Sequence, residues 1–554
     1  MSSHLLCKLA VLAPCSVLLL ALNLALAEDA GPTPEVMQQI PLEELRNELY
    51  VVRDKALLIN LSKAKTPEDW LQIPGVKGAW KKTPGQRGKT VLQDVDGDGK
   101  FELYGEGGSK DPQRSAFWCH EADGSTRWET PIHNGSDDNN GVQCEDLDGD
   151  GSFEAVCLGS HLTVMDARTG KIEAERCVFY DMVGSSDVKP SESSLRFDHP
   201  YRLAQCTDKK QFNIVVANGY SPDGQSKKGR HLTYAIGGVQ VVCYGHDGEI
   251  AWHYKHVGKG YEGGGHELRV HDFDGDGLDE VVYSANGGLV CVNHDGSERW
   301  RHDGWGMHSD WIEINDVIGD GKLNIVVQQG GAGGHFYVLD ANSGGVLRKI
   351  PNQPKCEVQN FAAAKYRPEL KGQQLALTAI GEATLRLVDL NTGEYLTFPV
   401  GAAEAPTIRR WNDLDMYNCA SHDADGDGVQ EVFTYTTPKP YQLNRVGKQE
   451  RPSDAAKALT VGVAAFRGDG SVAQYWNFYT PTATGIQWGV YEWEMRQFVA
   501  PERKFDVDGD GVEEAYLETQ SWLLLVQIAD LEKPANEVSR GQSKALSQAA
   551  VQTR

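Results

Sequence analysis

The sequence predicts an all-β fold: a β-propeller with eight four-stranded antiparallel blades and a short helical extension at the N-terminus, with seven blades as the alternative. Three features support this prediction. A short acidic motif, Asp-x-Asp-Gly-Asp-Gly, recurs along the chain, a hairpin with Asp-Gly or Thr-Gly at its tip follows most copies, and short apolar segments lie between them. One repeat therefore contains strand, acidic loop, strand, strand, turn and strand, which is the make-up of one propeller blade.

The acidic motif is the most regular part of the repeat. Each copy is followed by an acidic residue or Asn and then by apolar residues, as expected for a loop that leads into a buried strand. A degenerate copy begins at Asp316, with Ile318 and Asn324 at positions where the complete copies have Asp and Glu. The five complete copies begin at Asp94, Asp146, Asp272, Asp423 and Asp506.

Hairpins follow the acidic motifs at regular distances. Asp-Gly between two apolar runs is a strong hairpin signal, because the turn requires residues with positive φ. Three hairpins have Asp-Gly at the tip and end in Trp, and two variants carry Thr-Gly. They span residues 118–128, 242–252 and 290–300, and residues 164–170 and 387–393.

The first strands of the repeats number eight. Two repeats, near residues 207 and 363, lack the acidic motif but keep the hairpin and the spacing. Residues 438–459 are polar and interrupt the repeat, so we expect an insertion in the seventh blade. The last blade has the weakest pattern, which keeps seven blades open. The eight first strands lie near residues 94, 146, 207, 272, 316, 363, 423 and 506.

The segments outside the repeats set the predicted domain limits. Residues 1–27 have the Lys8 n-region, apolar stretch and small-x-small end of a secretory signal peptide. A membrane anchor is the alternative, but the apolar run is short for a span. The propeller is expected at residues 86–532, preceded by a partly helical extension at 28–85 and followed by a flexible tail at 533–554. Apolar residues at helical spacing predict the helix within residues 41–59; they are Leu42, Leu45, Leu49, Val52 and Leu57.

Composition excludes several kinds of partner. The formal net charge of −24 repels nucleic acid and leaves no basic patch for a membrane surface. We expect a monomer with no membrane span once the signal is removed. Two of the 11 cysteines lie in the signal, so an odd number remains and at least one thiol is free or pairs between chains. Cys157, Cys243 and Cys291 lie in apolar segments, where Cys usually acts as a small buried hydrophobe.

Three carboxylates on alternate positions of a tight loop predict a metal site. Ca²⁺ accepts about six to eight hard oxygen ligands, and carboxylates crowded in this way repel one another without a cation. We expect several structural calcium ions, with one at the substrate site as a further option; an acidic turn without an ion is the alternative for any single copy. The degenerate Asp316 loop is expected to be empty or weak. The predicted ligands are Asp94, Asp96, Asp98 and Glu102; Asp146, Asp148, Asp150 and Glu154; Asp272, Asp274, Asp276 and Glu280; Asp423, Asp425, Asp427 and Glu431; and Asp506, Asp508, Asp510 and Glu514.

Loops that enter the first strands, and loops between the second and third strands, meet at one mouth of a propeller channel. In this chain they are rich in His, Tyr, Arg and Asn, which suit a ligand with many hydroxyl and carboxyl groups and can move protons. Each of these residues alone has an alternative role in hydrogen bonds between loops. The candidate binding residues are Asn140, Tyr201, Asn218, His335 and Trp488. The candidate catalytic residues are Arg202, Tyr220, Tyr261, His266, His308 and Asp310.

Two segments resemble a known family. Residues 265–283 and 306–316, with Gly-His-Glu-Leu and Met-His-Ser-Asp ahead of their acidic motifs, are similar to the central repeat of the rhamnogalacturonan lyases of polysaccharide lyase family eleven. The acidic repeats also resemble FG-GAP and VCBS repeats. The resemblance implies a secreted, calcium-loaded propeller that cleaves a rhamnogalacturonan- or ulvan-like uronic-acid polymer by β-elimination. The N-terminal extension, in place of the family's β-domain, and the degenerate Asp316 loop depart from that pattern.

His266, His308 and Asp310 are the positions that match the family's motif best, and the requirements of β-elimination give the other candidates their roles at the mouth of the channel. His266 or His308 would take the proton at C5, with Asp310 orienting His308. A cation, Arg202 or a bound Ca²⁺, would neutralise the uronate, and Tyr220 or Tyr261 would donate to the leaving oxygen. The partner would be an acidic polysaccharide outside the cell or in the periplasm. Two other classes remain open: a non-catalytic carbohydrate- or protein-binding propeller, and a structural protein of the cell surface.

Overall fold

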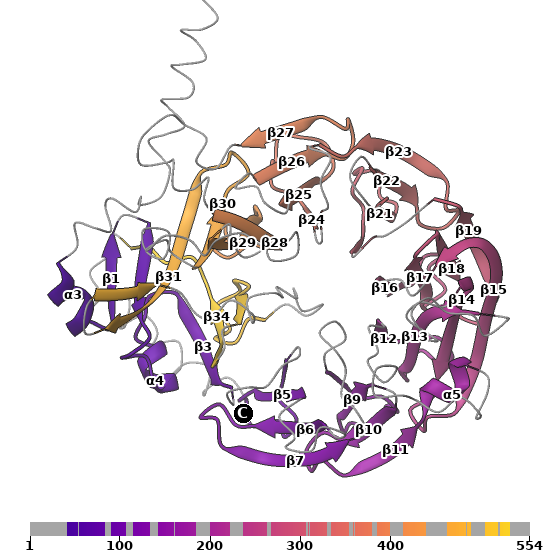
Figure 1. Ribbon diagram of the computed structural model, residues 1–554, viewed down its shortest axis with the longest axis horizontal. Coiled ribbons are helices and arrows are strands. Elements are labelled where there is room, and N and C mark those ends of the chain that lie inside the picture. Colours follow the sequence, from indigo (N-terminus) through magenta and orange to yellow (C-terminus); the bar gives the residue numbers. More distant parts are fainter. Residues whose placement is uncertain are drawn as a thin grey trace, which may run out of the picture.

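Eight β-sheets surround a central axis in the computed structural model, counted over the residues that it describes (Figure 1). The predicted eight-bladed propeller is therefore confirmed. The predicted signal peptide, the tail at 533–554 and nearly all of the insertion predicted at 438–459 lie outside the described residues. The structure describes residues 41–53, 55–82, 90–106, 115–132, 142–159, 161–183, 200–221, 236–262, 267–305, 309, 311–329, 334–353, 358, 361–378, 385–398, 414–438, 462–482, 485–488, 505–518 and 521–531.

Six blades have four antiparallel strands in chain order, with the first strand nearest the axis and the fourth at the rim (Figure 1). The short helix α5 (Val178–Val183) lies between blades 2 and 3 in the chain. The strands are, in blade 1, β4 (Val91–Gln93), β5 (Glu102–Glu106), β6 (Ser115–His120) and β7 (Thr126–Ile132); in blade 2, β8 (Gln143–Glu145), β9 (Glu154–Leu158), β10 (Leu162–Asp166) and β11 (Ile172–Arg176); in blade 3, β12 (Tyr201–Ala204), β13 (Asn213–Tyr220), β14 (Ile236–Tyr244) and β15 (Ile250–Glu262); in blade 4, β16 (Glu267–His271), β17 (Glu280–Ala285), β18 (Gly288–Val292) and β19 (Glu298–Asp303); in blade 5, β20 (Ile312–Asn315), β21 (Asn324–Gln328), β22 (His335–Asp340) and β23 (Val346–Pro351); and in blade 6, β24 (Phe361–Ala364), β25 (Gln374–Thr378), β26 (Leu385–Asp389) and β27 (Tyr395–Phe398).

The two ends of the chain meet in the last two blades. In blade 8, β3 (Val76–Lys81) from the N-terminal part pairs antiparallel with β34 (Trp522–Val526), which pairs with β33 (Ala515–Glu518). In blade 7, β2 (Ala56–Asn60) adds in parallel to the outer strand β31 (Val472–Thr482). This closure ties the first described residues to the last. The other strands of the blade 7 sheet are β28 (Leu414–His422), β29 (Glu431–Pro438), β30 (Gly462–Phe466), β32 (Gly485–Trp488) and β1 (Tyr50–Arg53).

The N-terminal extension is less helical than predicted. Residues 41–59 contain only one short helix, α3 (Leu42–Asn47), before β1 and β2. A second short helix, α4 (Pro67–Trp70), follows these strands. The helix expected over the rest of this segment is wrong, since β2 is a strand in which every residue is buried. Apolar side chains on both faces of such a strand can match a helical period by chance. The predicted limit at residue 85 falls after β3, which belongs to the blade 8 sheet.

One hydrogen bond recurs in all eight blades. The residue at the start of each second strand accepts a hydrogen bond, through its side-chain oxygen, from the backbone N–H seven residues earlier, in the loop that follows the first strand. We call this contact the clasp. In the two blades without the acidic motif the acceptor is an amide instead of a carboxylate. The acceptors are Glu102, Glu154, Asn213, Glu280, Asn324, Gln374, Glu431 and Glu514.

The Trp residues that end the hairpins join neighbouring blades. Trp300 of blade 4 donates from Nε1 to the carbonyl of Ala341 in blade 5, at 3.0 Å, and covers Gly344. A Cβ on Gly344 would lie 2.6 Å from the Trp300 ring, and its φ is +71°. Trp128 of blade 1 makes the same contacts with blade 2, and its Nε1 donates to the carbonyl of Ala167 at 2.9 Å. The Thr-Gly and Ser-Gly turns therefore need a residue without a side chain, because an indole ring packs on them.

Candidate functional site

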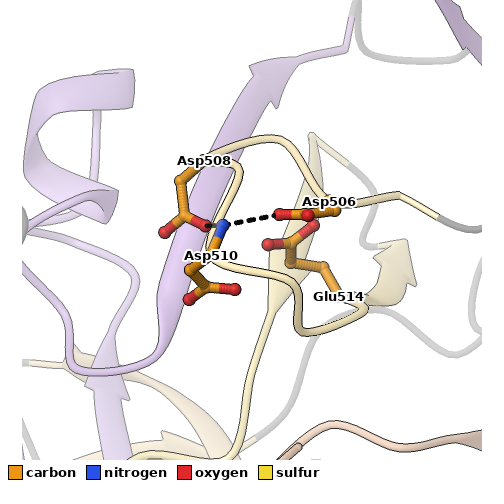
Figure 2. Close-up of side chains that lie close together, drawn as sticks. All are labelled: Asp506, Asp508, Asp510 and Glu514. Atoms are coloured by element: carbon orange, nitrogen blue, oxygen red, sulfur yellow. Dashed lines mark hydrogen bonds between the residues drawn. The ribbon is translucent and has the colours of Figure 1, made fainter. Parts of the chain in front are cut away.

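Carboxylate groups gather in the five complete acidic loops, where first strands end. In the loop from Asp506 to Glu514, one oxygen of each of four side chains lies within 4.8 Å of the others (Figure 2). The four smaller clusters contain three acids each: Asp94, Asp96 and Glu102; Asp146, Asp148 and Glu154; Asp272, Asp274 and Asp276; and Asp423, Asp425 and Glu431. Of the predicted ligands, Asp98, Asp150, Glu280 and Asp427 lie outside these clusters.

The backbone of the loops folds around the first Asp. Asp506 accepts hydrogen bonds from the N–H groups of Asp510 and Gly511, each at 3.0 Å, as Figure 2 shows for Asp510. Gly509 and Gly511 have φ of +72° and +84°, a region that other residues rarely adopt. The motif thus specifies a turn in which carboxylates are brought together by the backbone itself.

The donor set of the loops fits a hard cation. All clustered ligands are carboxylate oxygens, which suit Ca²⁺ or Mg²⁺. In the loop from Asp423, the buried Oδ1 of Asp423 has no hydrogen-bond partner within the part of the chain that is described, so this acceptor fits a cation ligand. Burial raises the pKa of the closing carboxyls, to about 7 for Glu102, Glu154 and Glu514 and to about 8 for Glu431. A bound cation would favour the ionised forms.

Basic side chains reach four of the five complete loops. Arg127 on β7 lies 2.8 Å from Asp96 and 3.2 Å from Glu102. Arg299 contacts Asp274, Arg467 contacts Asp425, and Lys77 contacts Asp508 and Asp510. No ion pair among the described residues reaches the loop from Asp146. The loops therefore differ in how far the protein itself neutralises their charge.

The degenerate loop keeps its shape without the ligand set. Asp316 accepts from Gly319 and Gly321, as the first Asp of a complete loop does. Asn324 forms the clasp with Val317 at 3.1 Å, and buried Ile318 takes the place of the second acid. Among the described residues this loop forms no carboxylate cluster, in agreement with its degenerate motif.

Several predicted mouth residues lie outside the described residues: His266, His308, Asp310 and Asn140. Trp488 belongs to β32, of which only the backbone is described. Tyr220 ends β13 and is half-buried, with the Lys255 ammonium 5.1 Å from its ring centre. His335 begins β22, and burial lowers its pKa.

Two predicted binding residues, Tyr201 and Asn218, lie in the core. Tyr201 is fully buried and donates to the carbonyl of Val156 at 2.9 Å. Asn218 is also fully buried, and its Oδ1 accepts from Gly219 at 2.6 Å. Both residues are on strands of blade 3, and their side chains are buried in the packing around that blade. Neither side chain has exposed surface.

Tyr261, a predicted proton donor, packs on the turn between β17 and β18 of blade 4. It ends the fourth strand β15, is fully buried and donates to Asp303 at 2.8 Å, and burial raises its pKa. Arg301 also donates to Asp303, at 2.9 Å, and His256 lies 3.7 Å from the same carboxylate. The hydrogen bond from Tyr261 to Asp303 therefore joins the fourth strands of blades 3 and 4.

A charged ladder crosses the first strands of blades 3 to 5. Arg202 on β12 is buried and donates to Glu267 on β16 at 2.6 Å. Arg269, two residues further along β16, lies 3.3 Å from Glu267 and donates to the carbonyl of Ile312 at 3.1 Å. We call Arg202, Glu267, Arg269, Trp311 and Glu313 the ladder.

The far end of the ladder holds a carboxyl with a shifted pKa. The Arg269 guanidinium lies 4.4 Å from the centre of the Trp311 ring, and Trp311 donates to Glu313 at 2.7 Å. Burial raises the pKa of Glu313 to about 7, although the Trp311 hydrogen bond, the nearby Arg269 and the backbone of Ala363 on β24 lower it. A carboxyl poised near neutral pH is suited to proton transfer.

Four of the ladder residues are not among the site residues predicted from the sequence: Glu267, Arg269, Trp311 and Glu313. The sequence pattern pointed to loops, whereas these residues lie in or next to first strands. The signal was the alternation of charged and apolar residues at 267–270, where a strand flanked by blades would ordinarily be apolar throughout.

The chain is similar to polysaccharide-degrading propellers. A family model described as the lambda-carrageenase β-propeller domain matches residues 237–372, which contain blades 4 and 5 and the ladder from Glu267 to Glu313. No curated protein matches the chain. This match covers less than half of the chain.

Solved structures share the fold at low identity. The exotype rhamnogalacturonan lyase YesX has a TM-score of 0.50 and 16% identity, over 82% of this chain and 76% of that chain. The Bacillus licheniformis rhamnogalacturonan lyase PL11 has a TM-score of 0.42 and 17% identity, over 70% and 74%. The V. cholerae biofilm matrix protein Bap1 has a TM-score of 0.44 and 13% identity, over 83% and 92%. The first of these similarities shows that the propeller fold is shared.

Proposed function

We propose that the chain is a secreted, calcium-binding polysaccharide lyase that cleaves a uronic-acid-containing polymer, of the rhamnogalacturonan or ulvan kind, by β-elimination. The observation that carries the proposal is the ladder, in which two guanidinium groups and a carboxyl of raised pKa share the first strands of neighbouring blades. The fold shared with a rhamnogalacturonan lyase supports it.

β-Elimination needs three groups. A cation stabilises the negative charge that develops when the C5 proton is removed, a base takes that proton, and an acid protonates the oxygen that leaves C4 as the C4–C5 double bond forms. Arg269 and Arg202 are the described cations. His266 and His308, which precede Glu267 and Trp311 by one and three positions in the sequence, are the proposed bases, and Glu313 or Tyr220 supplies the proton.

In this proposal calcium is structural. The carboxylate clusters lie in the loops after the first strands, while the proposed reaction takes place where those strands begin. The ions would hold the turns between the first and second strands, and a further ion at the substrate is not required because the ladder contains guanidinium groups. When bound, Ca²⁺ would supply positive charge to the loop carboxylates.

The test is incubation with rhamnogalacturonan, ulvan and lambda-carrageenan. Elimination produces a conjugated double bond, so ultraviolet absorbance should rise with one of the uronic-acid polymers. We expect Glu313→Gln, His266→Ala and His308→Ala each to lower turnover roughly a hundredfold. The matched control Glu298→Gln, on the rim strand β19, should retain activity. Products without unsaturated ends, or full activity in all three variants, would contradict the proposal.

The second candidate is a non-catalytic propeller that binds an acidic polysaccharide or a protein. One observation favours it: Arg202 and Tyr261, predicted to act on substrate, are already bonded to Glu267 and Asp303. Polymer binding without any rise in absorbance would support this candidate. In both cases we propose that residues 1–27 direct the chain out of the cytoplasm and that it acts as a monomer; no helix among the described residues is long and apolar enough to span a bilayer.

A further inference from the structure

Three blades carry a cysteine at the same place in the third strand. Cys119, Cys243 and Cys291 each lie opposite the Trp residue that ends the hairpin. All three are fully buried. The chain therefore contains three equivalent thiols whose surroundings can be compared blade by blade.

The blades differ at the loop position that donates to the clasp. This position is Val95 in blade 1, Phe273 in blade 4 and Cys206 in blade 3. Only blade 3 of these three thus has a second sulfur at the matching position. Blade 3 is also one of the two blades without the acidic motif, so its turn has no carboxylate loop to hold an ion.

Asn213 connects the backbone at Cys206 to the strand that carries Cys243. The N–H of Cys206 donates to Oδ1 of Asn213 at 3.2 Å, and Nδ2 of Asn213 lies 3.5 Å from the carbonyl of Tyr244, the residue after Cys243. Both side chains are fully buried in the same apolar cluster between blades 3 and 4. The Cys206 thiol donates to the carbonyl of Asp279 at 3.6 Å, and the neighbouring Cys243 thiol raises its pKa.

We propose that Cys206 and Cys243 form a disulfide that fixes the turn between β12 and β13, the task that a bound ion is proposed to perform in the acidic loops. Two S–H bonds break and one S–S bond forms. The two electrons and two protons pass to an external disulfide, such as oxidised glutathione, which is reduced to two thiols. The bond closes a loop from residue 206 to residue 243 and removes conformational freedom from the unfolded chain.

The buried position sets when the bond can form. The neighbouring Cys243 thiol and burial raise the pKa of Cys206, so the reactive thiolate is disfavoured once the blade has packed. The cross-link should therefore form during folding in an oxidising medium and should form slowly in the folded, reduced protein.

The test is refolding of the full chain with oxidised glutathione, followed by alkylation in denaturant and peptide mass spectrometry. We expect one linked peptide pair containing Cys206 and Cys243, while Cys119 and Cys291 are alkylated. The melting temperature should fall by several degrees on reduction. Alkylation of Cys206 and Cys243 to the same extent as Cys119 and Cys291, or a link to any other cysteine, would overturn the proposal.

Two variants separate the cross-link from packing. In Cys206→Ala the difference in melting temperature between oxidised and reduced protein should disappear. In Cys291→Ala, which removes the equivalent thiol of blade 4, the difference should remain. A difference that persists in Cys206→Ala would also overturn the proposal, and because lyase activity is not measured, the result is independent of the proposed function.

Discussion

The clasp shows what a single closing residue does in this repeat. Glu, Asn and Gln all serve as acceptor, because the backbone N–H of the loop needs an oxygen whether or not a cation is nearby. The closing Glu therefore has two separable tasks, a hydrogen bond that every blade has and a charge that only the acidic loops have. An unsatisfied buried N–H costs about 1–3 kcal/mol.

Substitution of Glu154 should separate these tasks. In the unsubstituted protein the N–H of Leu147 donates to the Glu154 carboxylate at 2.7 Å. Glu154→Gln keeps an acceptor for this N–H, whereas Glu154→Ala leaves the buried group without its partner. In excess chelator we expect Glu154→Ala to lower the free energy of unfolding by about 1–3 kcal/mol and Glu154→Gln to change it by less than about 1 kcal/mol. Urea denaturation measures both. Equal losses in the two variants would mean that charge and not the clasp stabilises the loop.

Glu313 predicts a pH dependence of stability. Its pKa of about 7 in the folded protein lies above its ordinary value, so the folded state binds this proton more tightly than the unfolded state. The stability contributed by Glu313 is present below about pH 4.5 and is lost as pH rises through about 7. The Glu313→Gln variant cannot ionise there. Relative to wild type, its free energy of unfolding should therefore rise with pH over this window by up to about 3 kcal/mol, measured by denaturation at several pH values; a constant difference would contradict the assignment.

At the scale of elements, neighbouring blades are joined by side chains as well as by apolar packing. The hairpin Trp of one blade covers the turn glycine of the next, and the ladder links three first strands in series. Such contacts decide how the blades pack against one another, whereas the strand pattern within each blade does not decide that packing.

Two glycines with the same φ of +71° isolate the Trp contact. A Cβ on Gly344 would lie 2.6 Å from Trp300, whereas a Cβ on Gly304 would have no atom within 4 Å. Gly304→Ala should cost only the backbone strain, about 1 kcal/mol. Gly344→Ala should cost a further 1–3 kcal/mol or so, because the ring must move. Thermal unfolding of the two variants provides the comparison, and similar losses would show that the Trp contact is unimportant.

At the scale of the whole molecule, charge is concentrated in the acidic loops. The carboxylates of the five complete loops contribute to the formal net charge of −24, and four of these loops have a basic neighbour. Those basic groups contact only some of the carboxylates in each loop. The folded ring therefore retains groups of like charges that a cation would neutralise.

Removal of metal should destabilise the ring. Ions that bind only the folded state stabilise it by mass action, so exhaustive chelation should lower the melting temperature, and Ca²⁺ should restore it better than Mg²⁺. Differential scanning calorimetry with metal analysis measures the effect. Asp274→Ala, in a clustered loop, should cost more stability than Asp320→Ala in the degenerate loop. An unchanged melting curve in metal-free protein would contradict this prediction.

Local patterns in the sequence were enough to predict the propeller, its eight blades, the acidic loops and the glycine turns, because each of these features depends on residues close together in the chain. Short apolar segments, positive-φ glycines and alternate carboxylates specify one blade at a time. The amphipathic pattern at 41–59 was misleading because a strand buried on both faces and a helix can share it.

The tertiary structure alone decided which distant residues meet. β2 and β3 join strands more than four hundred residues away, Arg202 pairs with Glu267 of the next blade, and Tyr201 and Asn218 turn into the core instead of the mouth. Glu313 acquires its raised pKa from the burial that packing of blades produces. These outcomes depend on the packing of one sheet on another, and a pattern of neighbours along the chain carries no information about that packing.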